Sequence, residues 1–157
     1  MNLINQMGDE DQTIRNIFTL AFQNHKKNNL EKAESLYKKI LQINPKHVGS
    51  MFYLAGSLAQ RKKFLEANLL FQKIVKINPK YKTAYNNLGA TYMMLGDLKK
   101  AKDYFEKEIK MQPNYAEAHS NLGIVLSKEG QYEKALDSYK KAIKFNPNHL
   151  NANINIA

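Results

Sequence analysis

The sequence contains no cysteine and no tryptophan, and only seven glycines and four prolines among 157 residues. Without cysteine, the chain can form neither a disulfide bond nor a metal site built on thiolates. No apolar run approaches the roughly 18 to 20 residues that a membrane-spanning helix needs. No charged-then-apolar leader precedes a small-residue cleavage site at the start of the chain. These absences favour a cytoplasmic protein.

Arginine is also scarce, because only Arg15 and Arg61 interrupt a set of 24 basic residues that is otherwise lysine. The net charge is +10, and residues 14–81 contribute all of it. The planar guanidinium of arginine suits bidentate recognition of phosphates and bases, whereas lysine is a strongly hydrated point charge. The composition therefore argues against a dedicated nucleic-acid reader, and no nucleic-acid partner is expected.

The few prolines reveal a repeat, because each stands 34 residues after the one before it. Four alanines and four aromatic residues recur at the same interval. The recurring residues are Pro45, Pro79, Pro113 and Pro147, Ala33, Ala67, Ala101 and Ala135, and Tyr37, Phe71, Phe105 and Tyr139. A period of this length is typical of stacked helix–turn–helix units. The repeats, numbered one to four, run over 14–47, 48–81, 82–115 and 116–149, with a partial fifth at 150–157 and an extension at 1–13.

Two further positions strengthen the pattern. Counted from the start of each repeat, position 7 is leucine and position 8 is alanine or glycine. These residues are Leu20, Leu54, Leu88 and Leu122, and Ala21, Ala55, Gly89 and Gly123. With alanine at 20, an aromatic residue at 24 and proline at 32, residues 14–157 resemble the tetratricopeptide repeat (TPR) family. The resemblance implies an all-α fold, a right-handed superhelical solenoid of antiparallel helix pairs comprising four repeats and the first helix of a fifth.

Each repeat is expected to contain two helices separated by a short break. In repeat three, apolar spacing predicts helices over about 82–95 and from Leu98 to Met111. Gly96 and Gly130 are expected to end the first helices of repeats three and four, and Asn28-Asn29 and Lys62-Lys63 those of repeats one and two. Small residues at positions 8 and 20 would let the two helices approach where they cross. Glu108, at a position expected to face the next repeat, has no evident partner in the sequence.

No catalytic or metal-binding constellation is evident. Among His25, His47, His119 and His149, no pair has the i, i+4 spacing of a helical metal site. The glycines are repeat positions rather than a phosphate-binding loop. We therefore predict a protein without catalytic residues, metal or cofactor.

The concave groove of the solenoid, lined by the first helices, is the binding surface that the family resemblance implies. Position 6 places Asn87, Asn121 and Asn155 at 34-residue intervals. Such a ladder of amides offers donors and acceptors to an extended peptide backbone. It is similar to the asparagine ladder in the TPR region of O-linked N-acetylglucosamine transferase-type proteins.

The groove positions of the first two repeats are aromatic instead. They hold Phe18, Phe22, Phe52 and Tyr53. The residues expected to form the core are those at positions 7 and 8, namely Leu20, Ala21, Leu54 and Ala55. The aromatic residues predict either a binding patch or a patch covered by residues 1–13, where Leu3, Ile4 and Met7 share one helical face. The family's Lys/Asn clamp for chaperone C-termini is absent, because Phe18, Phe22, Phe52 and Gly56 occupy its positions.

Position 26 is lysine in every repeat, on the side expected to be convex. These residues are Lys39, Lys73, Lys107 and Lys141. A cation there complements the C-terminal end of the helix dipole. A solvated face is the simpler interpretation, and an anionic partner is the alternative.

The favoured function is a scaffold that binds a protein or peptide in the concave groove. One alternative is the substrate-recognition arm of a larger enzyme of the glycosyl- or sulfotransferase type, with its catalytic domain beyond Ala157. Another is an assembly module. The chain stops inside the fifth repeat, and Leu150, Asn153 and Ile156 are expected to allow weak self-association there.

Overall fold

The computed structural model describes residues 3–156, with side chains from Glu10 onwards except those of residues 154 and 156. Within this range the chain forms nine α-helices and no strand. The helices fall into two compact units, Met1–Pro79 and Lys80–Ala157. No helix in the described range combines the length and hydrophobicity needed to cross a lipid bilayer.

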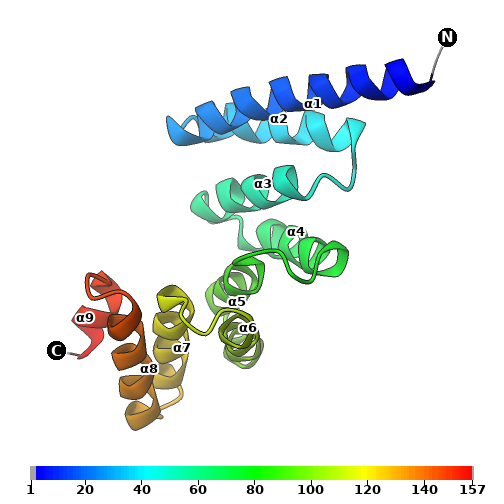
Figure 1. Cartoon of the computed structure of the whole chain (residues 1–157). Helices are drawn as coiled ribbons and strands as arrows, with labels where there is room; N and C mark the ends of the chain where they lie inside the picture. The colour runs from blue at the N-terminus through cyan, green and yellow to red at the C-terminus, as the bar shows by residue number, and fades with distance from the viewer. Residues whose placement is uncertain (1–2, 157) are drawn as a thin grey trace. The chain divides into compact units, whose positions relative to one another are not determined.

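The first compact unit holds four helices, which pack in chain order. They are α1 (Leu3–Lys26), α2 (Leu30–Ile43), α3 (Val48–Gln60) and α4 (Phe64–Ile77). Within this unit α1 packs on α2, α2 on α3 and α3 on α4 (Figure 1). Repeats one and two therefore each form a helix pair, as the 34-residue pattern predicts.

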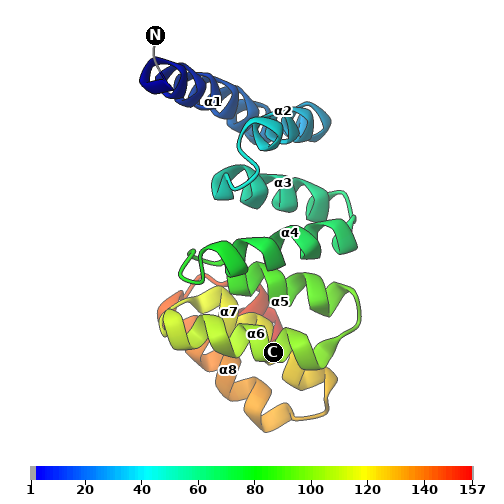
Figure 2. The ribbon, with the colours of Figure 1, turned by 90° about the vertical axis from the view of Figure 1, so that its right-hand side faces the viewer.

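The second compact unit holds two complete pairs and one further helix. These are α5 (Ala84–Met94), α6 (Leu98–Met111), α7 (Ala116–Lys128), α8 (Tyr132–Phe145) and α9 (Leu150–Ile156). Consecutive helices again pack on each other (Figures 1 and 2). The α9 helix confirms that residues 150–156 begin another helix, and its Ala152 is fully buried. Leu150, one of the residues expected to allow self-association at this end, is exposed.

The break between the two helices of a pair has the same geometry in all four repeats. Asn28, Lys62, Gly96 and Gly130 adopt a left-handed conformation, with φ angles of 60°, 60°, 85° and 75°. The N–H of the next residue then donates to a carbonyl five residues earlier, for example Asp97 to Tyr92 at 3.0 Å. This arrangement closes a helix by satisfying its last carbonyl groups. The predicted breaks are confirmed.

The repeated alanines and aromatic residues form the core, but the glycines at position 8 have a different neighbour from the one expected. A Cβ built on Gly123 would lie 2.5 Å from Cε1 of Tyr139, and one on Gly89 would lie 2.8 Å from Cε1 of Phe105. The Ala101 carbonyl oxygen would be 3.1 Å from the Gly89 Cβ. Both glycines therefore make room for the aromatic ring at position 24, and Gly89 also makes room for the backbone of Ala101 at position 20.

The prediction that Leu20 belongs to the core is wrong, because this side chain is 45% exposed. Its counterpart Leu54 is buried. The helix that carries Leu54, α3, has α2 on one side and α4 on the other. In the described part of the first unit, α1 packs against α2 and α3 and has no further helix on its other side.

The N-terminal extension continues the first helix, because α1 runs without a break from Leu3 to Lys26. At about 1.5 Å per residue, residues 3–13 extend away from Phe18 and Phe22 along the helix axis. In this helix they do not lie over these two rings. The side chains of Leu3, Ile4 and Met7, named in that alternative, lie outside the described residues.

Candidate peptide-binding surfaces

The first compact unit gathers six rings from α1, α2 and α3. This aromatic cluster consists of Phe18, Phe22, His25, Tyr37, Phe52 and Tyr53. Phe18, Phe22 and His25 share a face of α1 because they are four and three residues apart. Tyr53 is the centre of the cluster, since its ring centroid lies 5.1 to 5.9 Å from those of the five others. The structure thus brings together all four aromatic residues that the sequence singles out.

The cluster is buried on one side and accessible on the other. Phe18, Phe22, Phe52 and Tyr53 are half-buried, whereas Tyr37 is fully buried and stacks on Tyr53 with an interplanar angle of 16°. The Tyr37 hydroxyl finds no hydrogen-bond partner among the described residues. Burial, followed by the neighbouring Tyr53, raises the pKa of Tyr37 to about 12. The cluster is therefore a neutral aromatic wall with partly exposed rings.

Polar groups at its edge are fixed by local contacts. Nδ1 of His25 lies 2.9 Å from the Ser57 hydroxyl, and burial lowers the pKa of His25. The Lys26 ammonium sits 4.8 Å from the centre of the Phe22 ring, a cation–π contact. These contacts leave aromatic faces, rather than free charges, as the chemistry of this surface.

The three ladder asparagines lie on α5, α7 and α9 of the second unit, but they are not equivalent. Asn87 and Asn155 each donate from Nδ2, at 2.8 Å, to the carbonyl four residues earlier, which belongs to Thr83 just before α5 and to Asn151 in α9. Asn121 is buried and donates instead to Oδ1 of Asn86, at 3.0 Å. Asn87 is half-buried and Asn155 is exposed. The amide of Asn121 therefore joins α7 to α5, and the other two are the more accessible members.

The Asn121 bond belongs to a buried network that explains Glu108. Oε2 of the fully buried Glu108 accepts the backbone N–H of Asn86 at 3.0 Å, and Oε1 accepts the side-chain amide of Gln112. Asn86 lies in the first turn of α5, where backbone N–H groups have no partner within the helix. Thr83, the residue before α5, provides no side-chain cap and has a φ of 62°. Glu108 thus caps α5 from the neighbouring helix.

A stack of three tyrosines, which the sequence reasoning missed, joins α5 to α6. The Tyr104 ring is parallel to those of Tyr85 and Tyr92, with centroids 6.1 and 5.5 Å away. The Lys107 ammonium lies 5.2 Å from the Tyr104 centroid. Desolvation raises the pKa of Tyr104, so its hydroxyl stays neutral. Lys107, one of the lysines at position 26, is therefore engaged by aromatic faces as well as by solvent.

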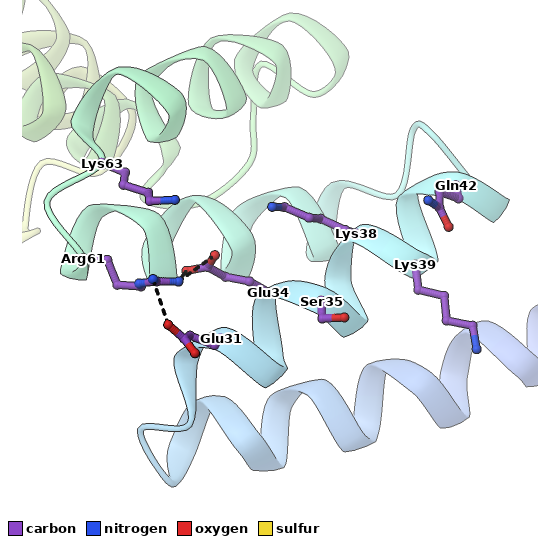
Figure 3. Close-up of a pocket in the computed structure, with 8 residues that line it drawn as sticks. All are labelled: Glu31, Glu34, Ser35, Lys38, Lys39, Gln42, Arg61 and Lys63. Carbon is purple, nitrogen blue, oxygen red and sulfur yellow. Dashed lines mark hydrogen bonds and ion pairs between the residues drawn. The ribbon is translucent and has the colours of Figure 1, made fainter.

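A hollow of about 630 Å³ opens between α2 and the turn that joins α3 to α4 (Figure 3). Nη1 of Arg61 lies 3.2 Å from both carboxylate oxygens of Glu34, and Nη2 lies 3.0 Å from Oε1 of Glu31. Figure 3 shows Lys38 and Lys63 reaching toward the hollow from opposite sides. Because Arg61 already holds both glutamates, the remaining lysines make the hollow basic.

No group of three histidine, aspartate or glutamate side chains in the described part of the chain is arranged to hold a metal ion. Instead, His47 and His149 have a structural role that the sequence reasoning missed. Nδ1 of His47 accepts the Ser50 N–H at the start of α3, and Nδ1 of His149 accepts the Ala152 N–H in α9. The sequence does carry a signal for this role, because both histidines stand at the same repeat position, directly before a first helix and 102 residues apart.

Comparison with known proteins identifies the family. Sequence profiles of the tetratricopeptide repeat match residues 18–47, 83–115 and 116–149, more than half of the chain. The chain belongs to the tetratricopeptide repeat family. Domains of this family typically mediate protein–protein interaction. No curated protein sequence gives a significant match.

Solved structures of other TPR proteins share the fold. MamA is 25% identical, with 93% of this chain and 80% of that one covered and a TM-score of 0.83. The segment of MamA from residue 41 onwards, from Desulfovibrio magneticus RS-1, is 21% identical, with 96% and 83% covered and a TM-score of 0.83. YrrB, described as a TPR protein with an unusual peptide-binding site, is 22% identical, with 89% and 72% covered and a TM-score of 0.75. These likenesses confirm the predicted all-α TPR fold.

Proposed function

We propose that this TPR protein is a non-catalytic scaffold that holds an extended segment of a partner protein against the first helices of its repeats. The observation that carries the proposal is the aromatic cluster, in which half-buried rings surround Tyr53. Partly exposed aromatic rings fixed by their neighbours are well suited to contact apolar side chains of a partner. Fixed rings also lose little conformational entropy when a partner binds.

The second compact unit supports the same function with polar groups. The side-chain oxygens of Asn87 and Asn155 receive no hydrogen bond from the described residues, so they can accept N–H groups of a peptide backbone. Asn121 contributes less, because its side-chain amide already donates a hydrogen bond to Asn86. The peptide-binding site recorded for YrrB supports a peptide as the partner by analogy of fold.

A peptide selection on the full chain tests the proposal. Peptides selected from a random phage-displayed library are expected to contain aromatic or branched apolar residues. Phe22→Ala should weaken their binding by about tenfold, the loss of one well-placed aromatic contact. Leu20→Ala is the matched control, because Leu20 is an exposed apolar residue on the same helix outside the cluster. Equal affinity of wild type and Phe22→Ala, with both folded by circular dichroism, would rule out the aromatic cluster as the binding surface.

A further inference from the structure

The α4 helix exposes two leucines one turn apart, Leu65 at 63% and Leu69 at 52%. They occupy positions 18 and 22 of their repeat. The other three repeats carry polar residues at these positions, namely Glu31 and Ser35, Lys99 and Asp103, and Glu133 and Asp137. The fold of a repeat therefore does not require leucine at either position. An apolar pair that contributes little to the core and faces solvent is a candidate contact surface.

Lysines flank this apolar pair along the chain. Lys73 follows Leu69 by four residues and lies on the same face of α4, and Lys62 stands in the turn just before the helix, three residues before Leu65. Glu66 is the only acidic residue of α4, and it lies 3.8 Å from the Lys63 ammonium. Lys63, the residue directly before α4, also lines the basic hollow of Figure 3. The apolar pair is thus set in a positively charged surface.

The charge of the whole first compact unit points the same way. Residues 14–79 carry twelve basic residues against three glutamates. Arg61 binds two of these glutamates, Glu31 and Glu34, and the third is Glu66. A partner that covers Leu65 and Leu69 therefore meets a unit of strong positive charge, and complementary carboxylates would both attract and orient it.

The second unit contains an apolar pair of the same spacing in a less basic repeat. Tyr132 and Leu136 are 71% and 37% exposed on α8. Repeat four carries five lysines and four acidic residues, against six basic residues and one glutamate in repeat two. The two exposed pairs therefore differ in the net charge of their repeats, which makes the α8 pair an internal control.

We propose that Leu65, Leu69 and Lys73 of α4, together with Lys62 in the preceding turn, form a second docking site, which binds an acidic amphipathic helix of a partner protein. Apolar residues of the partner at helical spacing cover the two leucines, while its acidic residues meet Lys62 and Lys73. The site goes beyond the proposed function, since it lies on a second helix of a repeat and not on the first helices that carry the aromatic cluster. Because the apolar area is small, the lysines supply much of the attraction, and binding weakens with salt.

The probe is a fluorescein-labelled peptide of about 18 residues, or five helical turns, with leucines at helical spacing and glutamates elsewhere. Its binding to the full chain is followed by fluorescence anisotropy. The variant L65E/L69D gives α4 the residues that repeat four has at these positions, and Kd should rise by about tenfold or more. The variant Y132E/L136D makes the same charge change at the same spacing on α8, and Kd should stay within about twofold. Equal losses in both variants, or no loss in L65E/L69D, would overturn the proposal.

Two further measurements distinguish an acidic helix from other possible occupants of this surface. The variant Phe22→Ala distinguishes this site from the aromatic cluster. If L65E/L69D abolishes cosedimentation with vesicles rich in phosphatidylglycerol but leaves peptide binding intact, the surface contacts a membrane and the proposal fails. If the variant instead abolishes self-association of the chain in sedimentation equilibrium without affecting peptide binding, the occupant is a second copy and the proposal also fails. Phe22→Ala should leave probe binding unchanged, so failure of the groove proposal does not remove this one.

Discussion

The guanidinium of Arg61, at the end of α3, lies 3.2 Å from both carboxylate oxygens of Glu34 on α2. The same two repeat positions meet again in the second compact unit, where Lys102 on α6 lies 3.3 Å from Glu129 at the end of α7. The charges are reversed between the two junctions. The ion pair at each junction therefore matches the two repeats that it joins. Reversing the charge of one partner alone would place like charges side by side.

Reversing one charge at the first junction should destabilise the protein, and reversing both should restore it. Glu34 is buried and Arg61 is partly exposed, so Glu34→Lys is expected to cost about 2 kcal/mol, between the values for exposed and buried ion pairs. The double variant E34K/R61E should recover most of this loss. Urea unfolding monitored by circular dichroism measures both. A double variant no more stable than E34K would show that charge pairing is not what holds this junction.

Glu108 should be important for stability because it caps α5 from α6. Glu108→Ala leaves the Asn86 N–H buried without a partner and is expected to cost about 2–3 kcal/mol in free energy of unfolding. Glu108→Gln keeps an acceptor oxygen at the same place and should cost about 1 kcal/mol. The same unfolding measurement distinguishes the two, and equal losses would exclude the capping role.

The glycines of the repeats should differ sharply in their tolerance of alanine. Gly123→Ala puts a methyl group against the buried Tyr139 ring and is expected to cost about 1–3 kcal/mol. Gly56 lies within α3, and no atom comes within 4 Å of a Cβ built there. Gly56→Ala should therefore stabilise the helix by about 0.5–1 kcal/mol. Thermal unfolding of the two variants tests this contrast, and a destabilised Gly56→Ala would contradict it.

Stability should fall as the pH drops below neutrality. Burial lowers the pKa of His47 and of His25 below the ordinary value of 6.5, so the folded state favours the neutral imidazole. The unfolded chain binds protons first, and the stabilisation present above pH 6.5 is lost as the pH falls through the lowered pKa values. Protonation of His47 also removes the Nδ1 acceptor that caps α3.

His47→Asn isolates this effect, because asparagine caps a helix without titrating in this range. The drop in Tm between pH 7 and pH 5 is expected to be smaller in this variant than in the wild type. An unchanged drop would assign the pH dependence to other groups.

The asparagines of the ladder should separate into binding and structural residues. The variant N87A/N155A is expected to weaken peptide binding by about thirtyfold, at roughly 1 kcal/mol for each of the two hydrogen bonds, with little change in stability. Asn121→Ala removes the hydrogen bond to Asn86 and should lower the free energy of unfolding instead. Anisotropy titrations and urea unfolding of both variants test the division. Unaltered peptide binding by N87A/N155A would remove the ladder from the proposed function.

The sequence by itself determined the repeat and the local structure of each helix pair. The 34-residue spacing of Pro45 and its equivalents predicts the pairs, and the breaks at Asn28 and Lys62 result from local backbone chemistry. Alanine at position 20 and an aromatic residue at position 24 predict the buried face of each second helix. These features depend on residues within one or two helical turns of each other, and they recur in all four repeats.

Only the tertiary structure decided which of these side chains are buried and which form hydrogen bonds or ion pairs within the protein. Leu20 and Leu54 share a repeat position, yet only Leu54 lies between two neighbouring helices. Glu108 finds the N–H of Asn86 22 residues away, and Asn121 finds the Asn86 side chain 35 residues away. Burial and hydrogen bonding at such distances depend on which helix faces meet, and a pattern read along one chain does not contain that information.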